Sequence, residues 1–378
     1  MFDYEVLRII WWVLLGVLLI GFAIMDGFDL GAAIALPFIA KTDVERRLVI
    51  NTVGPVWEGN QVWFVLGGGA IFAAWPYVYA VSFSGFYLAM LLILWALILR
   101  PVAFTFRGKA TGQTWTTVWD WAIFISGFVP ALIFGVAVGN VLQGVPFQFD
   151  DSLQMVYTGS FFALLNPFAL LCGLLSVAML LMHAGIYLSI KTEDVLHERS
   201  GKMARFFGIL TIVLFAAAGC WIAFINGYEV TSVLAHDGPS NPLHKEVILT
   251  SGIWLQNYHA YPWMLTAPIL GFLGAGLTVM LARKSNSKSV ILASAISIFG
   301  IISTVGLSMF PFILPSSSMP NVSLLVWDAS SSKLTLQIML FATVVFLPII
   351  LLYTAYVFRV FRGKVTAEYL ETNSKNLY

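Results

Sequence analysis

The chain has 378 residues, of which 59% are hydrophobic and only 10% are charged, and its mean hydropathy is +0.88. An average soluble protein carries about 25% charged residues, so a soluble protein of this composition could not cover its surface with polar groups. The formal net charge is +1, which leaves no basic patch of the kind that binds nucleic acid. These values predict a polytopic, all-α membrane protein whose surroundings are the lipid bilayer.

Long apolar runs divide the chain into nine candidate membrane helices, each near the ~20 residues that cross the hydrocarbon core. The predicted spans are 7–38, 50–74, 77–100, 119–141, 161–190, 203–226, 260–282, 288–311 and 335–359. The second is the weakest, because Glu58, Asn60 and Gln61 interrupt it. No cleavable signal peptide is expected, because Asp3 and Glu5 stand where a basic region would be. We expect residues 1–378 to form a single integral-membrane domain.

The distribution of Lys and Arg favours nine spans over eight, because basic residues concentrate on the cytoplasmic side of a membrane. With nine spans, the connections rich in Lys and Arg all fall on one face of the membrane: 39–49, 101–118, 191–202, 283–288 and the tail. The connections with few or no basic residues fall on the other face: 142–160, 227–259 and 312–334. With eight, the segment 39–49 would lie outside despite Lys41, Arg46 and Arg47. We therefore expect a periplasmic N-terminus and a cytoplasmic C-terminus.

Two stretches place acidic residues where a membrane tolerates them poorly: Asp26-Gly27-Phe28-Asp29 and Trp57-Glu58-Gly59-Asn60-Gln61. A carboxylate at the membrane centre costs about 2.5–3.5 kcal/mol on insertion scales and is usually kept for function. At ~1.5 Å per residue, Asp26 lies about 28 Å along the first span and Glu58 about 12 Å into the second. All three acids are therefore expected in or near the cytoplasmic half, with Glu58 deepest, where they suit proton uptake.

Glu58 is the predicted proton-relay residue, because a shielded carboxyl group can both accept and release a proton near neutral pH. We expect Asp26, Asp29, Asn60 and Gln61 to form a supporting polar cavity. The alternatives are that both aspartates only cap or bend a helix end, and that Glu58 is held by an unidentified basic or hydrogen-bonding partner.

Residues that could bind a cofactor are scarce in the predicted spans. Of the five histidines, only His183 falls within one, and a satisfied interior histidine is the more common role. Cys172 and Cys220 belong to no CxxC pair and are expected to be small buried hydrophobes. No Walker A, Rossmann or HExxH motif occurs, so no metal site is predicted. Any electron-transfer cofactor is expected on a partner chain. Gly67, Gly68, Gly69 and Gly85 are candidates for close helix contacts with such a partner.

Several sequence blocks resemble subunit II of the bacterial cytochrome bd ubiquinol oxidases, from one end of the chain to the other. The most specific are Trp57-Glu58-Gly59-Asn60-Gln61-Val62-Trp63 and Trp327-Asp328-Ala329-Ser330-Ser331-Ser332. Weaker ones are Phe2-Asp3-Tyr4-Glu5, Trp11-Trp12, Asp26-Gly27-Phe28-Asp29, Glu45-Arg46-Arg47, Phe72-Ala73-Ala74-Trp75-Pro76, Phe83-Ser84-Gly85-Phe86-Tyr87, Arg100-Pro101, Gly139-Asn140, Gly144-Val145-Pro146-Phe147, Asn166-Pro167-Phe168, Ser240-Asn241-Pro242-Leu243 and Phe310-Pro311-Phe312.

The resemblance implies a subunit of a bacterial inner-membrane complex that oxidises ubiquinol and reduces O2 to water, generating proton-motive force without pumping. It implies that haem b and haem d are held mainly by subunit I, that a small third subunit is common, and that this subunit can hold a structural ubiquinone. It further implies that the acid at the position of Glu58 belongs to a cytoplasmic proton route.

Two other functions are compatible with the residues alone. A proton- or sodium-coupled membrane carrier would use intramembrane acids and broken helices equally well, and would act without haem. A purely structural scaffold would tolerate an amide at each acidic position.

Overall fold

The computed structural model describes residues 3–110, 112–282 and 289–372. The basic connection 283–288, with Phe2 and Lys375, lies outside the described residues. The α-helices are α1 (Tyr4–Met25), α2 (Gly27–Ile39), α3 (Asp43–Val53), α4 (Trp57–Asn60), α5 (Val62–Ala74), α6 (Pro76–Gly85), α7 (Tyr87–Arg107), α8 (Gln113–Gln143), α9 (Pro167–Lys191), α10 (Asp194–Ile222), α11 (Gln256–Ala260), α12 (Thr266–Leu281), α13 (Ser289–Met309), α14 (Lys333–Val360) and α15 (Ala367–Thr372).

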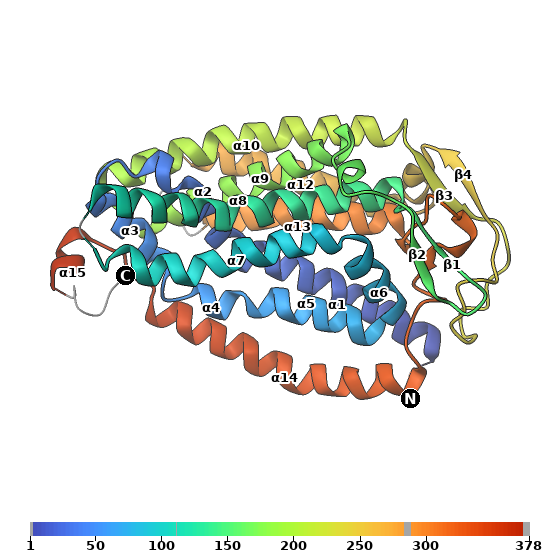
Figure 1. Ribbon diagram of the computed structural model, residues 1–378. Coiled ribbons are helices and arrows are strands. Elements are labelled where there is room, and N and C mark those ends of the chain that lie inside the picture. Colours follow the sequence, from blue (N-terminus) through green and yellow to red (C-terminus); the bar gives the residue numbers. More distant parts are fainter. Residues whose placement is uncertain (1–2, 111, 283–288, 373–378) are drawn as a thin grey trace.

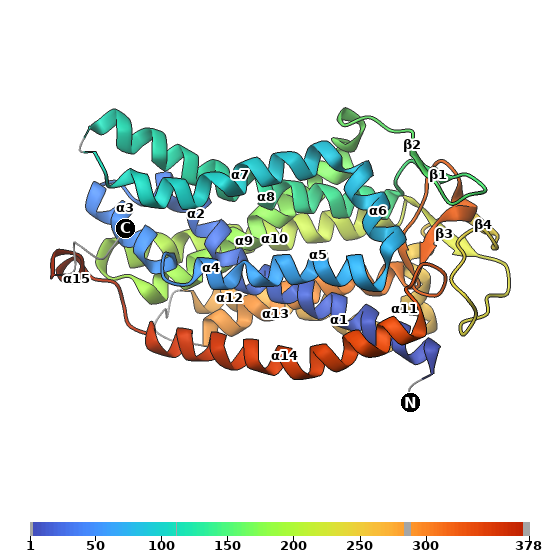
Figure 2. The same ribbon diagram turned by 60° about the horizontal axis from the view of Figure 1, so that its bottom comes forward.

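The long helices run side by side along one axis and form an elongated bundle (Figures 1 and 2). One end of the bundle, here called the strand end, carries short antiparallel hairpins, and the opposite end, the α3 end, carries α3 and α15 (Figure 1). The hairpins pair β1 (Phe147–Phe149) with β2 (Met155–Tyr157), β3 (Asn226–Val230) with β4 (Val247–Ser251), and β5 (Phe312–Leu314) with β6 (Leu324–Leu325). Three of the predicted connections, 142–160, 227–259 and 312–334, therefore contain strands, which the sequence analysis did not predict.

Eight helical segments of the described chain are long and apolar enough to cross a membrane, which confirms the predicted class of all-α, multi-pass membrane protein. They are Tyr4–Ile39, Tyr87–Arg107, Gln113–Gln143, Pro167–Lys191, Asp194–Ile222, Pro262–Leu281, Ser289–Met309 and Lys333–Val360. Each overlaps one predicted span. The remaining prediction, 50–74, is not one continuous helix, because Gly54-Pro55 separates α3 from α4 and a further turn separates α4 from α5.

The third and fifth predicted spans begin too early. The helix α6 ends at Gly85, and Phe86 has φ −93° and ψ 22°, so the long helix starts only at Tyr87. The residues before Pro167 form a short 3₁₀ turn (Phe162–Leu164), and α9 begins where the side chain of Asn166 accepts a hydrogen bond from the backbone N–H of Ala169.

Burial is very uneven between helices. The most hydrophobic window of α9 is 78% buried, and α9 packs against α2, α8 and α10, whereas none of the corresponding window of α14 is buried. Small residues allow the close approach: a methyl group at Gly31 would come within 2.5 Å of the Leu180 carbonyl oxygen. In both views α14 lies at the edge of the bundle (Figures 1 and 2).

The Trp327–Ser332 motif holds the strand end together. Lys245 donates to Asp328 at 2.5 Å, and the Asp328 carboxylate also accepts the Leu325 backbone N–H at 2.9 Å. The Ser331 N–H donates to the Ala74 carbonyl at 2.8 Å, which joins the motif to the end of α5. This highly specific block therefore has a structural role at the strand end.

Candidate functional site

A break between α1 and α2 brings two acids into the middle of the protein. Asp26 is the residue at the break, and Asp29 lies in the first turn of α2. Both side chains are only 2% exposed. Two carboxyl groups this far from solvent need polar partners inside the bundle.

Arg100 of α7 is the partner of Asp26. Its Nη1 donates to Asp26 Oδ1 at 3.1 Å, and the arginine is 1% exposed. The sequence analysis named Arg100 only in the Arg100-Pro101 block and assigned it no role, so it missed this partner. The available signal was an arginine at the end of an apolar run, which requires an acidic or hydrogen-bonding partner.

Asn60 is the partner of Asp29. The one-turn helix α4 turns Asn60 inward, and its Nδ2 donates to Asp29 Oδ2 at 2.7 Å. The side chains of Asp26, Asp29, Asn60 and Arg100 thus form one buried group, here called the polar cluster. It joins three separate parts of the chain: the α1–α2 break, α4 and α7.

Glu58 lies outside the polar cluster. Trp57 and Asn60 are three residues apart and share the inward face of α4, so Glu58, between them, is on the exposed face. Its side chain makes no hydrogen bond or ion pair to another residue in the described ranges. Gln61 is half-buried beside it. The structure therefore brings together Asp26, Asp29 and Asn60 but leaves Glu58 on the surface of this chain.

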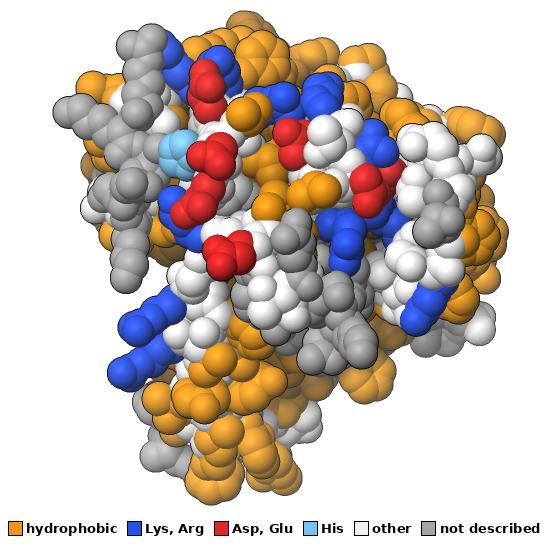
Figure 3. Space-filling model, turned by 90° about the vertical axis from the view of Figure 1, so that its left-hand side faces the viewer, with side chains coloured by type: hydrophobic (Ala, Val, Ile, Leu, Met, Phe, Trp, Pro, Cys, Tyr) orange, Lys and Arg blue, Asp and Glu red, His pale blue; other side chains and the backbone are white. Residues whose placement is uncertain are grey.

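A second charged group fixes the α3 end. Asp120 is 2% exposed and lies between Arg46 Nη1 and Arg107 Nε, each 2.6 Å from one of its oxygens, and Arg107 also binds the exposed Asp43 at 2.8 Å. Figure 3 shows this end of the molecule, where acidic and basic side chains lie close together and apolar side chains surround them. These pairs join α3 to α7 and α8.

Glu45 ties α3 to α10. It completes a capping box with Thr42, and Arg199 Nη1 donates to its Oε2 at 3.0 Å. Partial burial acts to raise the pKa of Glu45, but the backbone N–H groups of Lys41 and Thr42 and the charge of Arg199 together lower that pKa below its ordinary value.

The remaining candidate ligands do not form a cofactor site. Both ring nitrogens of His183 have partners, Ser294 Oγ at 2.7 Å and the Ile24 carbonyl at 3.0 Å, so neither is free to bind a haem iron. Both cysteines are unpaired; Cys172 is buried, but the expectation of burial is wrong for Cys220, which is on the exposed side of α10. No group of three metal-ligating acids, histidines or cysteines occurs among the described residues.

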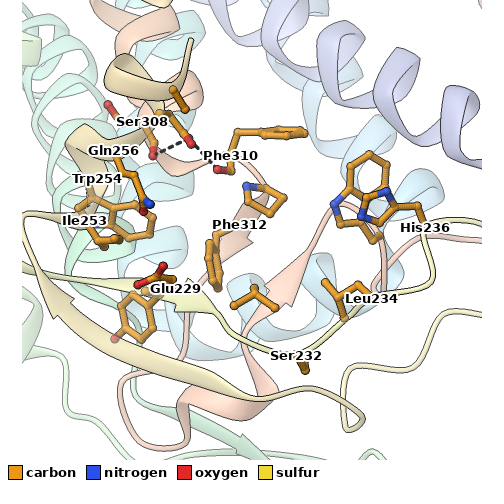
Figure 4. A pocket seen from close by; sticks show the side chains of 16 residues that line it. Glu229, Ser232, Leu234, His236, Ile253, Trp254, Gln256, Ser308, Phe310 and Phe312 are labelled. Carbon is orange, nitrogen blue, oxygen red and sulfur yellow. Dashed lines mark hydrogen bonds between the residues drawn. The ribbon is translucent and has the colours of Figure 1, made fainter.

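The strand end contains a cavity of about 380 Å³. Aromatic side chains make up much of its wall, among them Trp254, Phe310 and Phe312, with Gln256 on one side and His236 on the opposite side (Figure 4). Tyr228 also lines it; burial raises the pKa of this hydroxyl to about 12, so it stays protonated and donates to the Gln143 carbonyl at 3.2 Å.

Comparison with known proteins decides the family. The sequence model of cytochrome bd terminal oxidase subunit II matches residues 7–361. The chain belongs to this family. It is 49% identical to the "Cytochrome bd-I ubiquinol oxidase subunit 2" of Escherichia coli over 379 residues and 50% identical to the "Probable cytochrome oxidase subunit 2" of Haemophilus influenzae over 378 residues, in both cases over 100% of each chain.

More distant relatives of this cytochrome bd subunit II chain agree. The "Cytochrome bd ubiquinol oxidase subunit 2" of Bacillus subtilis is 29% identical over 361 residues, which is 94% of this chain and 96% of that protein. The fold is similar to the bd oxidase structure of Geobacillus thermodenitrificans, with a TM-score of 0.67 and 16% identity over 94% of this chain and 98% of that chain. The family predicted from the sequence is confirmed.

Proposed function

We propose that this chain, as one integral-membrane domain of a bacterial inner membrane, is subunit II of an electrogenic ubiquinol oxidase that reduces O2 to water. The match of the family model over residues 7–361 carries this proposal and favours it over an ion-coupled carrier. The haems b and d are expected on subunit I, as the resemblance implies, and both ring nitrogens of His183 are already hydrogen-bonded within this chain. A small third subunit completes the expected complex.

The surface around α5 and α14 is proposed to contact subunit I. The outer positions of α14 are apolar and strongly exposed, for example Phe341 at 74% and Leu352 at 72%. No atoms lie within 4 Å of where a side chain would begin at Gly67, Gly68 or Gly69 of α5. Gly67 is buried, but Gly69 is exposed, which leaves room for a second protein to approach the α5 backbone there. Gly85 instead contacts Tyr157 of this chain, so it is withdrawn as a candidate.

The strand end is proposed to be periplasmic and the α3 end cytoplasmic. The helix α1 begins at the strand end and α14 ends at the α3 end, so the chain crosses the bundle an odd number of times (Figure 1). Eight long helices give an even number, so α4 and α5 supply the additional pass. The basic residues Arg46, Arg107 and Arg199 cluster at the α3 end, in agreement with the positive-inside rule.

Glu58 is proposed to relay protons at the subunit interface rather than inside this chain. It is exposed on α4, and α5, which bears the exposed Gly69, follows α4 after one residue, so docking of subunit I along this surface would bury Glu58. A carboxyl group enclosed by two subunits can accept a proton from the cytoplasmic side and release it toward the oxygen site. Asp26, Asp29, Asn60 and Gln61 are proposed to keep the adjoining interior polar.

Replacement of Glu58 tests this role. Glu58→Leu in the purified complex is expected to lower the O2-reduction turnover while the haem spectrum stays unchanged. Glu198→Leu is the control, because Glu198 is also an exposed glutamate, 66% exposed at its side chain, but lies on α10 away from α4. Full turnover in Glu58→Leu would remove the relay role, and loss of haem d would make Glu58 a structural residue.

The strand-end cavity is proposed to hold the ring of a structural ubiquinone. Its volume of about 380 Å³ and its aromatic lining suit a flat ring, and Gln256 and His236 can hydrogen-bond to ring oxygens. Ala260→Trp, which places a large side chain on the cavity wall, is expected to lower the quinone extracted from the purified complex. An unchanged quinone content would place the quinone elsewhere.

A further inference from the structure

The polar cluster contains two acids but one cation. Arg100 and Asp26 form an ion pair, and the charged groups that act on Asp29 are Asp26 and Arg100. The other titratable groups nearby are occupied: the Tyr187 hydroxyl donates to the Thr52 carbonyl at 2.8 Å, and both His183 nitrogens are bonded. With both acids ionised, the cluster would have a net negative charge inside the membrane, where an uncompensated charge is strongly unfavourable.

Some polar atoms of the same cluster have no hydrogen-bond partner among the residues that the structure describes. Arg100 uses Nη1, but its Nε and Nη2 are buried without a partner, and so is Asp29 Oδ1. Buried N–H and oxygen groups are nearly always hydrogen-bonded to protein or to ordered water. Two arginine donors and a carboxyl oxygen in one cluster provide the polar partners that a buried water molecule needs.

We propose that the polar cluster is an internal water site in which Asp29 is a neutral carboxylic acid and Arg100–Asp26 is the charged pair. The hydrogen bonds determine which acid keeps the proton. Asp26 is bonded to the guanidinium, which stabilises its ionised form, whereas Asp29 accepts from the uncharged amide of Asn60. The free oxygen of Asp29 carries the proton and donates it to water, which in turn accepts from Arg100.

Arg100 is then a positioning residue that sets the charge of the cluster. Asp29 is an exchangeable proton site bonded to Asn60 on the inward face of α4, the helix whose outer face carries Glu58. The charge assignment rests only on the contacts within this chain. A role for this proton in turnover would rest on the oxidase function proposed above.

Infrared spectroscopy of the purified complex tests the assignment directly. The C=O stretching band of a protonated carboxyl group is expected in the wild type and is expected to be lost in Asp29→Asn. Glu58→Gln is the control that keeps the Asp29 band, so the result is independent of whether Glu58 relays protons. Transfer to D2O is expected to shift the band, because water reaches the acid. A band that survives Asp29→Asn, or that does not shift in D2O, would overturn the proposal.

A double variant separates charge from folding. Asp26→Asn alone leaves Arg100 with Asp29 as its only acid, so Asp29 is expected to ionise and the band to disappear. In Asp26→Asn combined with Arg100→Gln, the cation is gone and the band is expected to return. Both variants lack the ion pair between Arg100 and Asp26. A difference in the carboxyl band between them therefore reports whether the Arg100 cation is present to ionise Asp29. If neither complex can be isolated, the wild-type comparison with Asp29→Asn decides, because that change leaves the proposed charge of the cluster unaltered.

Discussion

Asp120 and Asp43 contact the same guanidinium from two very different environments. Asp120 is buried between Arg107 and Arg46, whereas the side chain of Asp43 is 62% exposed at the protein surface. The geometry of the two contacts to Arg107 is similar, with distances of 2.6 and 2.8 Å. At the residue scale, burial should therefore decide what each pair contributes to stability.

Replacing Asp120 by alanine is expected to destabilise the protein by about 3–5 kcal/mol, because the change leaves buried positive charge without its counter-ion. Asp43→Ala is the matched control and is expected to cost about 0–1 kcal/mol, as exposed ion pairs do. Thermal denaturation of the purified complex measures both. Equal melting temperatures for the two variants would show that Asp120 is not the anchor of this group.

Arg100 and Glu58 show why side-chain roles were harder to predict than helices. The sequence indicates that an arginine at the end of an apolar run needs a partner, but the partner is 74 residues away, and no local pattern selects Asp26. For Glu58, the inward or outward direction depends on where α4 begins, and a one-turn helix has no hydrophobic periodicity that could show it.

The short helix α3 is the element whose stability depends most clearly on pH. It carries a capping box between Thr42 and Glu45, and Glu45 also binds Arg199 of α10. Burial acts to raise the pKa of Glu45, but the contacts to its carboxylate favour the ionised form and together lower that pKa in the folded state. A group with a lowered folded pKa stabilises the protein above its unfolded pKa, and that contribution is lost as the pH falls through the folded pKa.

Glu45→Gln is therefore expected to lower the melting temperature at pH 7. The difference from the wild type should shrink as the pH falls below the ordinary glutamate pKa of 4.5. Melting curves of both proteins between neutral and acidic pH measure this. Glu193→Gln serves as a control, because Glu193 pairs only at 3.5 Å with Lys364 and is 47% exposed. A difference for Glu45→Gln that grows toward acidic pH would contradict the assignment.

The length of the apolar runs made the long helices predictable. The segment 50–74 and the strands were not predicted correctly, for two different reasons. Eight predicted spans overlap the eight apolar helices because ~20 apolar residues leave few alternatives in a membrane protein. The segment 50–74 differs because Gly54-Pro55 interrupts it. The strands depend on long-range contacts, such as the Val145 N–H donating to the Pro315 carbonyl at 2.9 Å, which a short sequence window does not contain.

At the scale of the whole molecule, the face of α5 and α14 is the surface that we propose subunit I covers. A phenyl group at Gly69, which is exposed on α5, is expected to prevent close approach of subunit I and to reduce the haem that co-purifies with a tag on this chain several-fold. Gly219→Phe is the matched control, because Gly219 of α10 is equally exposed and open but lies on another face. Equal haem contents would place the interface elsewhere.

The helix α14 is fastened at its two ends and little in between. At the strand end the Trp11 Nε1 donates to the Leu336 carbonyl at 3.0 Å, and at the α3 end Lys191 Nζ donates to the carbonyls of Phe361 and Gly363. The order of synthesis gives this arrangement a consequence. The seven earlier apolar helices can complete the buried core around α9 before α14 leaves the ribosome, and α14 adds almost no core of its own. Assembly can therefore proceed in two stages: the bundle of earlier helices forms first, and α14 then binds to it by its two ends and presents its apolar surface to a partner. A subunit without its partner would then expose the face of α5 and α14 while its core around α9 stays complete.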